Sequence, residues 1–325
     1  MLSLRAATYM SKYCFSQFRM GGPIRMSKVS GYQGRTNDIV YMEPYNREDS
    51  NSVVVFFGGD VQDFPENMAT HRDNKQYIKW NLENTAVILQ SHFQHEHIVV
   101  VRPSRLASHK LATFMEFLSP DQEQRRMEFK VFACYDNFVP SNNTGAPEHT
   151  PMHYALHHLE RLLQSIATNL KEKDEEEKRD LKKGEVKLIG FSKGCVVLNQ
   201  FLYEFHYLKT LTPDDESLSP LVARITDMYW LDGGHSGGKN TWITSKGLLG
   251  TLARLGIRVH VHVTPYQICD DRRPWIRKEE KAFSDWLRKL GSPVKRMVHF
   301  ENSIPSLSIH FDVIDAAFNF SEGVT

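Results

Sequence analysis

VKLIGFSKG, residues 186–194, carries the strongest indication of the fold in this chain. Its apolar start predicts a buried strand, and the residues that follow, from 195 to 202, have the composition of a helix. Between them stands a G-x-S-x-G pattern made of Gly190, Ser192 and Gly194. In this context the pattern is typical of a nucleophile elbow, in which the glycines permit a tight turn that exposes the serine hydroxyl. The alternative is a plain strand-to-helix turn in which Ser192 caps the helix.

Beyond residue 38, strand-like and helix-like segments alternate. Strands are expected at 53–57, 97–101, 130–134, 186–189, 224–231, 257–263 and 295–300, and helices at 152–170, 195–202, 241–255, 278–290 and 312–320. This alternation predicts an α/β fold with a mainly parallel sheet and helices on both faces. The chain has 325 residues, and we expect residues 38–325 to form one domain of the α/β-hydrolase type.

Composition excludes several classes of function. The 40 basic and 39 acidic residues nearly cancel, so nucleic-acid binding is not expected. No apolar run approaches the roughly 20 residues of a membrane span, and we expect a soluble protein without a transmembrane segment. The four cysteines form no C-x-x-C pair, which favours a reducing compartment. We expect no metal and no cofactor.

The first 37 residues differ from the rest because they contain no aspartate or glutamate. Six basic residues are spread through them, namely Arg5, Lys12, Arg19, Arg25, Lys28 and Arg35. A basic, acid-poor segment that contains serine is typical of a mitochondrial transit peptide. Residues 1–37 are therefore predicted to be such a leader, which directs the protein to the mitochondrial matrix. The alternative is a disordered basic arm without a targeting function.

A serine nucleophile needs a histidine base and a carboxylate that orients the histidine. In α/β hydrolases the chain order is serine, acid, histidine. After Ser192, His310 stands in a predicted loop that precedes the last helix, and it is the expected base. The acid is expected after the second strand beyond the elbow, as Asp270 or Asp271, with Asp232 at the end of the first such strand as the competitor.

An oxyanion hole needs two backbone N–H donors. One is expected from Lys193, the residue after the nucleophile, and the other from the turn at Gly59 and Asp60, which follows the strand at 53–57. A glycine-rich turn at this place suits the purpose because a side chain would obstruct the substrate.

Several long stretches together resemble one known family. They are VVVFFGGDVQDFPENM, VKLIGFSKGCVVLNQFLYEF, LDGGHSGG and SIHFDVIDAAFNF. The sequence is similar over residues 38–325 to the mitochondrial protein family named after open reading frame 69 of chromosome 2. The resemblance implies an α/β-hydrolase fold, a mitochondrial location and a role in respiratory-chain function and energy metabolism. It carries over the elbow serine, Ser192, whereas the acid and base follow from position in the fold. Lys193 departs from typical active hydrolases.

Two classes of function remain open. The first is a serine hydrolase that acts on an ester, thioester or lipid acyl group without a cofactor, or an acyltransferase that uses the same serine. The second is an inactive hydrolase fold that binds a metabolic protein partner.

Overall fold

The computed structural model describes residues 21–45, 51–109, 130–143, 145–173, 181, 183–211, 218–235 and 237–319. Its main sheet has eight strands in the order β1-β2-β4-β3-β7-β8-β9-β10. In chain order these are β1 (Ile24–Ser30), β2 (Thr36–Met42), β3 (Val53–Phe57), β4 (His97–Val101), β7 (Val186–Phe191), β8 (Ile225–Leu231), β9 (Arg258–Val263) and β10 (Val294–Val298).

The strand order identifies the fold. β2 runs antiparallel to both of its neighbours, β1 and β4, while the strands from β4 to β10 are parallel to one another. A sheet of this order, with an antiparallel strand second from one edge, is that of an α/β hydrolase, as expected from the sequence. A separate antiparallel pair of strands, β5 (Arg105–His109) and β6 (Lys130–Cys134), lies outside this sheet.

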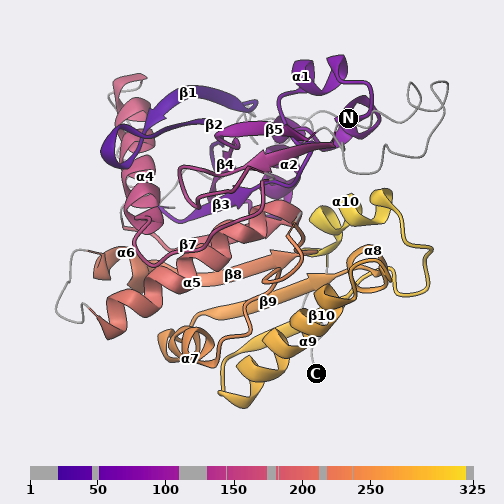
Figure 1. Cartoon of the computed structure of the whole chain (residues 1–325). Coiled ribbons are helices and arrows are strands. Elements are labelled where there is room, and N and C mark those ends of the chain that lie inside the picture. The colour runs from indigo at the N-terminus through magenta and orange to yellow at the C-terminus, as the bar shows by residue number, and fades with distance from the viewer. Residues whose placement is uncertain are drawn as a thin grey trace, which may run out of the picture.

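Helices cover both faces of the sheet (Figure 1). One face packs against α4 (Ala155–Lys173), α5 (Cys195–Thr210), α7 (Lys246–Leu255) and α9 (Pro274–Lys289), and the other against α2 (Leu82–His92) and α10 (Leu307–Ala316). Short helices are α1 (Pro65–Thr70), α6 (Ser219–Arg224) and α8 (Pro265–Ile268).

The side chains of β3 show why both faces must be covered. Val53, Val55 and Phe57 pack into the core on the α5 side, whereas Val54 and Phe56 pack into the core on the α2 side. All five are fully buried. A strand that is apolar at every position is stable only between two layers, since successive side chains point to opposite faces.

The position of β7 places the elbow at the centre of the molecule. β7 lies between β3 and β8, and both pairings are parallel. The carboxyl ends of these strands therefore meet at one edge of the sheet, where binding sites form in open α/β folds. The turns after β3, β7 and β8 carry Gly59, Ser192 and Asp232, and they are neighbours at this edge.

The structure corrects the expected start of the domain. β1 and the first residues of β2 lie within 1–37, the segment predicted as a leader or basic arm. Met26 and Val29 of β1 are buried in the core beside α4, so the folded domain begins well before residue 38. Residues 1–20 lie outside the described part of the chain.

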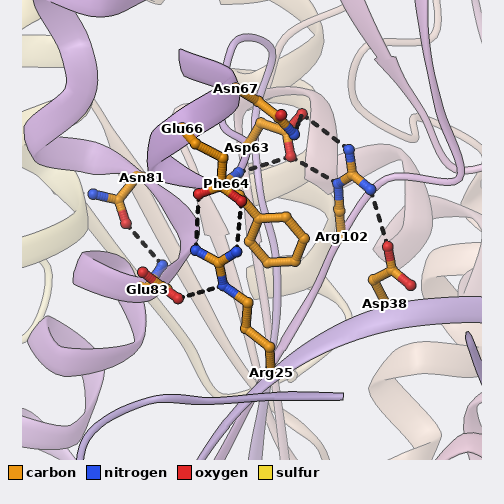
Figure 2. A network of polar contacts seen from close by, with 9 residues as sticks. All are labelled: Arg25, Asp38, Asp63, Phe64, Glu66, Asn67, Asn81, Glu83 and Arg102. Carbon is orange, nitrogen blue, oxygen red and sulfur yellow. Dashed lines mark hydrogen bonds and ion pairs between the residues drawn. The ribbon is translucent and has the colours of Figure 1, made fainter. Parts of the chain in front are cut away.

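A polar network anchors the segment that follows β3 (Figure 2). The guanidinium of Arg102 donates to both carboxylate oxygens of Asp63, at 2.7 and 3.1 Å, and to Asp38 of β2 at 2.9 Å. The ring of Phe64 lies 5.0 Å from this guanidinium and 4.2 Å from that of Arg25 in β1. The turn that carries Gly59 is thus held against the antiparallel edge of the sheet.

None of the helices in the described residues has the length and apolar character that a bilayer span requires.

Candidate active site

Ser192 stands in a strained turn between β7 and α5. Its backbone φ of 50° lies in the left-handed region, which non-glycine residues rarely adopt. A Cβ on Gly194 would overlap the carbonyl of Phe57, and a Cβ on Gly190 would lie 2.8 Å from the Cα of Cys195. Both elbow positions therefore require glycine because backbone passes too close. Strain of this kind is kept where a side chain must be aimed.

His310 and Asp232 form a buried pair. His310 Nδ1 lies 2.6 Å from Asp232 Oδ2, and the two residues are 4% and 0% exposed. The Thr264 N–H and hydroxyl donate to the same carboxylate at 2.8 and 2.6 Å. An ionised carboxylate only accepts hydrogen bonds, so Nδ1 carries the hydrogen and Nε2 is left as the acceptor. This is the tautomer that a general base for serine requires.

Two rings hold the imidazole of His310 from its sides. The centroid of Phe191, the residue before the nucleophile, lies 4.7 Å from the imidazole centroid, and that of Tyr266 lies at 4.6 Å. The contact with Phe191 brings the base beside the elbow. No hydrogen bond joins Ser192 Oγ to His310 or to any other residue in the described ranges.

The sequence predicted that His310 lies in a loop before the last helix. In the structure it lies instead in the first turn of α10. The helix begins earlier than the apolar pattern indicated. Ser306 caps it by accepting from the N–H of Ile309 at 3.4 Å, and a capping serine is a frequent helix start.

The structure does not bring Asp270 or Asp271 to His310. The Asp270 carboxylate accepts from the guanidinium groups of Arg272 and Arg273, and these bonds hold its pKa at about 2. Asp271 is exposed. Both belong to the turn after α8, where the short helix carries the chain past the end of β9. The carboxylate that faces the histidine is that of Asp232.

The oxyanion turn differs in detail from the expectation. The Gly59 N–H donates to Gln62 Oε1 at 2.8 Å, so it is engaged within the turn. The Asp60 N–H makes no hydrogen bond to a described residue. A Cβ on Gly59 would lie 2.9 Å from the Cβ of Ser192, so the glycine lets the turn touch the nucleophile. Of these two N–H groups, only that of Gly59 is engaged with a described residue.

The side chains of Lys193, which is buried, and Asp60, which is partly exposed, both belong to the surroundings of the elbow. Lys193 is fully buried, and its ammonium donates to the carbonyl of Gly145. Burial raises the pKa of Asp60, and the Lys193 ammonium partly opposes this rise. The Asp60 carboxylate accepts the Ala133 N–H at 2.7 Å. Lys193 therefore links the elbow to the segment that precedes α4, and it does not project into solvent.

Sequence reasoning missed Thr264 and Tyr266, which support the acid and the base. The signal available was weak: a threonine followed by a proline at a strand end is a common helix start. Among the described residues no group of His, Cys, Asp and Glu side chains is arranged to hold a metal ion.

The comparison with protein families is decisive. A model of the C2orf69 family matches residues 25–124, 122–186 and 172–293. The mouse protein "Mitochondrial protein C2orf69 homolog" is 38% identical over 303 residues, which cover 80% of this chain and 76% of the mouse protein. This chain belongs to the C2orf69 family. The human "Mitochondrial protein C2orf69" is likewise 38% identical over 304 residues, covering 80% of this chain and 72% of that protein.

Among solved structures, esterases are similar to this member of the C2orf69 family. Esterase Est22 has 14% identity and a TM-score of 0.46 over 91% of this chain and 78% of its own. A thermostable esterase has 11% identity and a TM-score of 0.42 over 92% of this chain and 61% of its own. These values are low, and the fold assignment therefore depends on the strand order described above.

Proposed function

We propose that this protein is a mitochondrial serine hydrolase that cleaves an ester, thioester or lipid acyl group. The observation that carries the proposal is the buried hydrogen bond of 2.6 Å between His310 Nδ1 and Asp232 Oδ2, formed beside a serine that is strained on an elbow. The names of the curated relatives support the mitochondrial location. The matrix, and a role in respiratory-chain function and energy metabolism, are further parts of the proposal.

The geometry supports a two-step acyl transfer. His310 Nε2 takes the proton of Ser192 Oγ while that oxygen attacks the carbonyl carbon of the substrate. Asp232 holds the Nδ1–H and stabilises the imidazolium that forms. The negative charge on the carbonyl oxygen faces the N–H groups of Asp60 and Lys193. His310 then protonates the leaving group as its bond to the carbonyl carbon breaks. In the second step His310 takes a proton from water while the water oxygen attacks the carbonyl carbon of the acyl-enzyme, and His310 returns that proton to Ser192 Oγ as the acid product is released.

One observation favours a second function, a binding protein without turnover. The Ser192 hydroxyl makes no hydrogen bond to His310 or to the rest of the described residues. In ligand-free hydrolases this bond is often long and tightens only with substrate, which is why the hydrolase stands first.

Labelling with a fluorophosphonate probe tests the choice, because the probe reacts with activated serines without knowledge of the substrate. We expect the wild-type protein to be labelled, and Ser192→Ala and His310→Ala to lose the label. Ser308→Ala is a matched control, since Ser308 is exposed in the same helix turn as His310, and it should label like the wild type. A folded wild-type protein that remains unlabelled would favour the binding protein.

A further inference from the structure

Two aromatic rings lie against the imidazole of the proposed base. The ring of Phe191, in β7, has its centroid 4.7 Å from that of His310, with an angle of 36° between the planes. The ring of Tyr266, in α8, lies at 4.6 Å with an angle of 34°. Within the described part of the chain these two rings do not contact each other, so they lie against different parts of the imidazole. The base is thus held between the strand of the nucleophile and the short helix after β9.

The imidazole of His310 becomes charged in both steps of the proposed reaction, because it takes a proton from serine in the first and from water in the second. The face of an aromatic ring carries partial negative charge, and it attracts a cation within about 6 Å of its centroid. The attraction is stronger away from water, and His310 is 4% exposed. A ring against the base therefore stabilises the imidazolium more than the neutral imidazole, which is the kind of interaction that accelerates a reaction.

The two rings differ in what else they contact. Phe191 is fully buried in the core, and its ring also lies 5.4 Å from that of Phe311. Tyr266 is partly exposed, and among the described residues its ring contacts only that of His310. Burial raises the pKa of the Tyr266 phenol, so this ring meets the imidazolium as a neutral group. Tyr266 is thus the ring that can be replaced without opening the core.

We propose that Tyr266 is a positioning residue whose ring fixes the imidazole of His310 beside the elbow and stabilises the imidazolium that forms there. It acts through the base and touches no reacting atom. The effect on catalysis rests on the proposed function, whereas the attraction between the ring and the protonated base does not.

The pH profile of kcat/KM for any accepted ester separates this role from plain packing. Tyr266→Leu keeps an apolar side chain over the imidazole and removes the ring, so the imidazolium loses the attraction without gaining water. We expect the acid limb of the profile to move to lower pH by about 0.5 and kcat to fall about threefold, with KM unchanged. Tyr266→Phe retains the ring and should reproduce the wild-type profile. Tyr266→Met takes the place of the leucine variant if that variant does not fold.

The carboxylates near His310 are the same in all of these variants. Asp232 of β8 binds Nδ1 at 2.6 Å. Burial raises the pKa of Asp60, in the turn after β3, and the nearby imidazole is among the groups that oppose this rise when it is charged. Asp312 follows two residues later in α10, while β7 and α8 contribute the two uncharged rings. A moved acid limb in Tyr266→Leu therefore reports the loss of the ring.

Tyr203→Leu is the matched control. Tyr203 is also partly exposed, and its ring lies 5.4 Å from that of His149, which takes no part in the proposed mechanism. This substitution should leave the acid limb in place. If Tyr266→Leu lowers kcat without moving the limb, or if Tyr266→Phe moves it as far as Tyr266→Leu does, the ring does not act on the imidazolium and the inference is wrong.

Titration of the imidazole by NMR needs no substrate, and it separates this inference from the proposed function. In protein labelled with ¹⁵N at histidine, the resonances that are missing from His310→Gln identify the base. We expect its titration midpoint to lie about 0.5 lower in pH in Tyr266→Leu than in the wild type and in Tyr266→Phe. If the wild-type protein cleaves no ester and this difference persists, the reaction is wrong and the role of the ring stands. Equal midpoints in the three proteins would overturn the inference.

Discussion

At the scale of single residues, substitution can test directly whether Asp232 is the acid that orients His310. In Asp232→Asn the amide can donate to His310 Nδ1 and stabilise the tautomer whose Nε2 carries the hydrogen, which cannot accept the serine proton. We expect kcat to fall by about 10⁴-fold with the fold retained. Asp271→Asn, a change to an exposed residue with no contact to His310, should leave kcat within about twofold of the wild type. Steady-state kinetics on any accepted ester measures both, and a comparable loss in Asp271→Asn would contradict the assignment.

The sequence limited the acid to three aspartates but could not choose among them. Each ends a strand or begins the next loop, and all three occur in the chain order of a hydrolase triad. The choice depends on two facts that pattern does not contain. Thr264 donates two hydrogen bonds to the Asp232 carboxylate, and Arg272 and Arg273 donate to the Asp270 carboxylate. The Gly59 N–H was likewise not predictable. Two adjacent glycines in the sequence do not reveal that this N–H donates to Gln62 Oε1.

At the scale of elements, the network of Figure 2 predicts that replacing Arg102 lowers the free energy of unfolding more than replacing Arg25 does. Arg102→Ala leaves the 4% exposed residue Asp63 without its cation, and we expect a loss of about 2 kcal/mol in the free energy of unfolding. Arg25→Ala removes contacts to Glu66 and Glu83, of which Glu66 has a side chain 57% exposed. Exposed pairs contribute about 1 kcal/mol or less.

Urea unfolding of the two variants measures this difference. Because Asp63 lies in the turn that also carries Asp60, Arg102→Ala should in addition lower kcat, and Arg25→Ala should not. If both substitutions lower the free energy of unfolding by the same amount, the burial of Asp63 does not add to the cost of removing its cation.

The central elements were predictable and the edge was not. The strands at 53–57 and 97–101 match β3 and β4 because buried parallel strands are runs of valine, isoleucine and phenylalanine. β1 has the sequence IRMSKVS, in which Met26 and Val29 are buried, Ile24 is partly buried against the core, and the other four residues are exposed. An edge strand of this composition looks like a basic leader until its partner β2 is known.

At the scale of the whole molecule, β5 and β6 form a second, two-stranded sheet beside the main one. In the chain both strands lie between β4 and α4, and residues in and just after β6 contact the turn after β3. The Ala133 N–H binds Asp60, and the hydroxyl of Tyr135, just after β6, donates to the carbonyl of Gly58 at 2.9 Å. The turn after β3 is thus held both by the antiparallel edge of the sheet, through Arg102 and Asp63, and by this second sheet. Neither support is visible in the G-x-S-x-G pattern.

Buried histidines make the stability of the whole molecule dependent on pH. Burial lowers the pKa values of His158 and His262 to about 3. His158 Nδ1 accepts the Tyr32 N–H at 3.1 Å, so protonation would break this bond. A histidine whose pKa is lower in the folded than in the unfolded state stabilises the fold above pH 6.5. That contribution is lost as the pH falls toward 3, because the unfolded chain takes up protons first.

Between pH 7 and pH 5 we expect the free energy of unfolding to fall by about 2 kcal/mol for each such histidine. His158→Gln carries no ionisable group at this position, and it should reduce the fall by about 2 kcal/mol. His95→Gln, at an exposed position, is the control and should leave the fall unchanged. Urea unfolding at the two pH values gives the comparison. A fall of the same size in His158→Gln and in the wild type would mean that His158 already binds its proton in the folded protein.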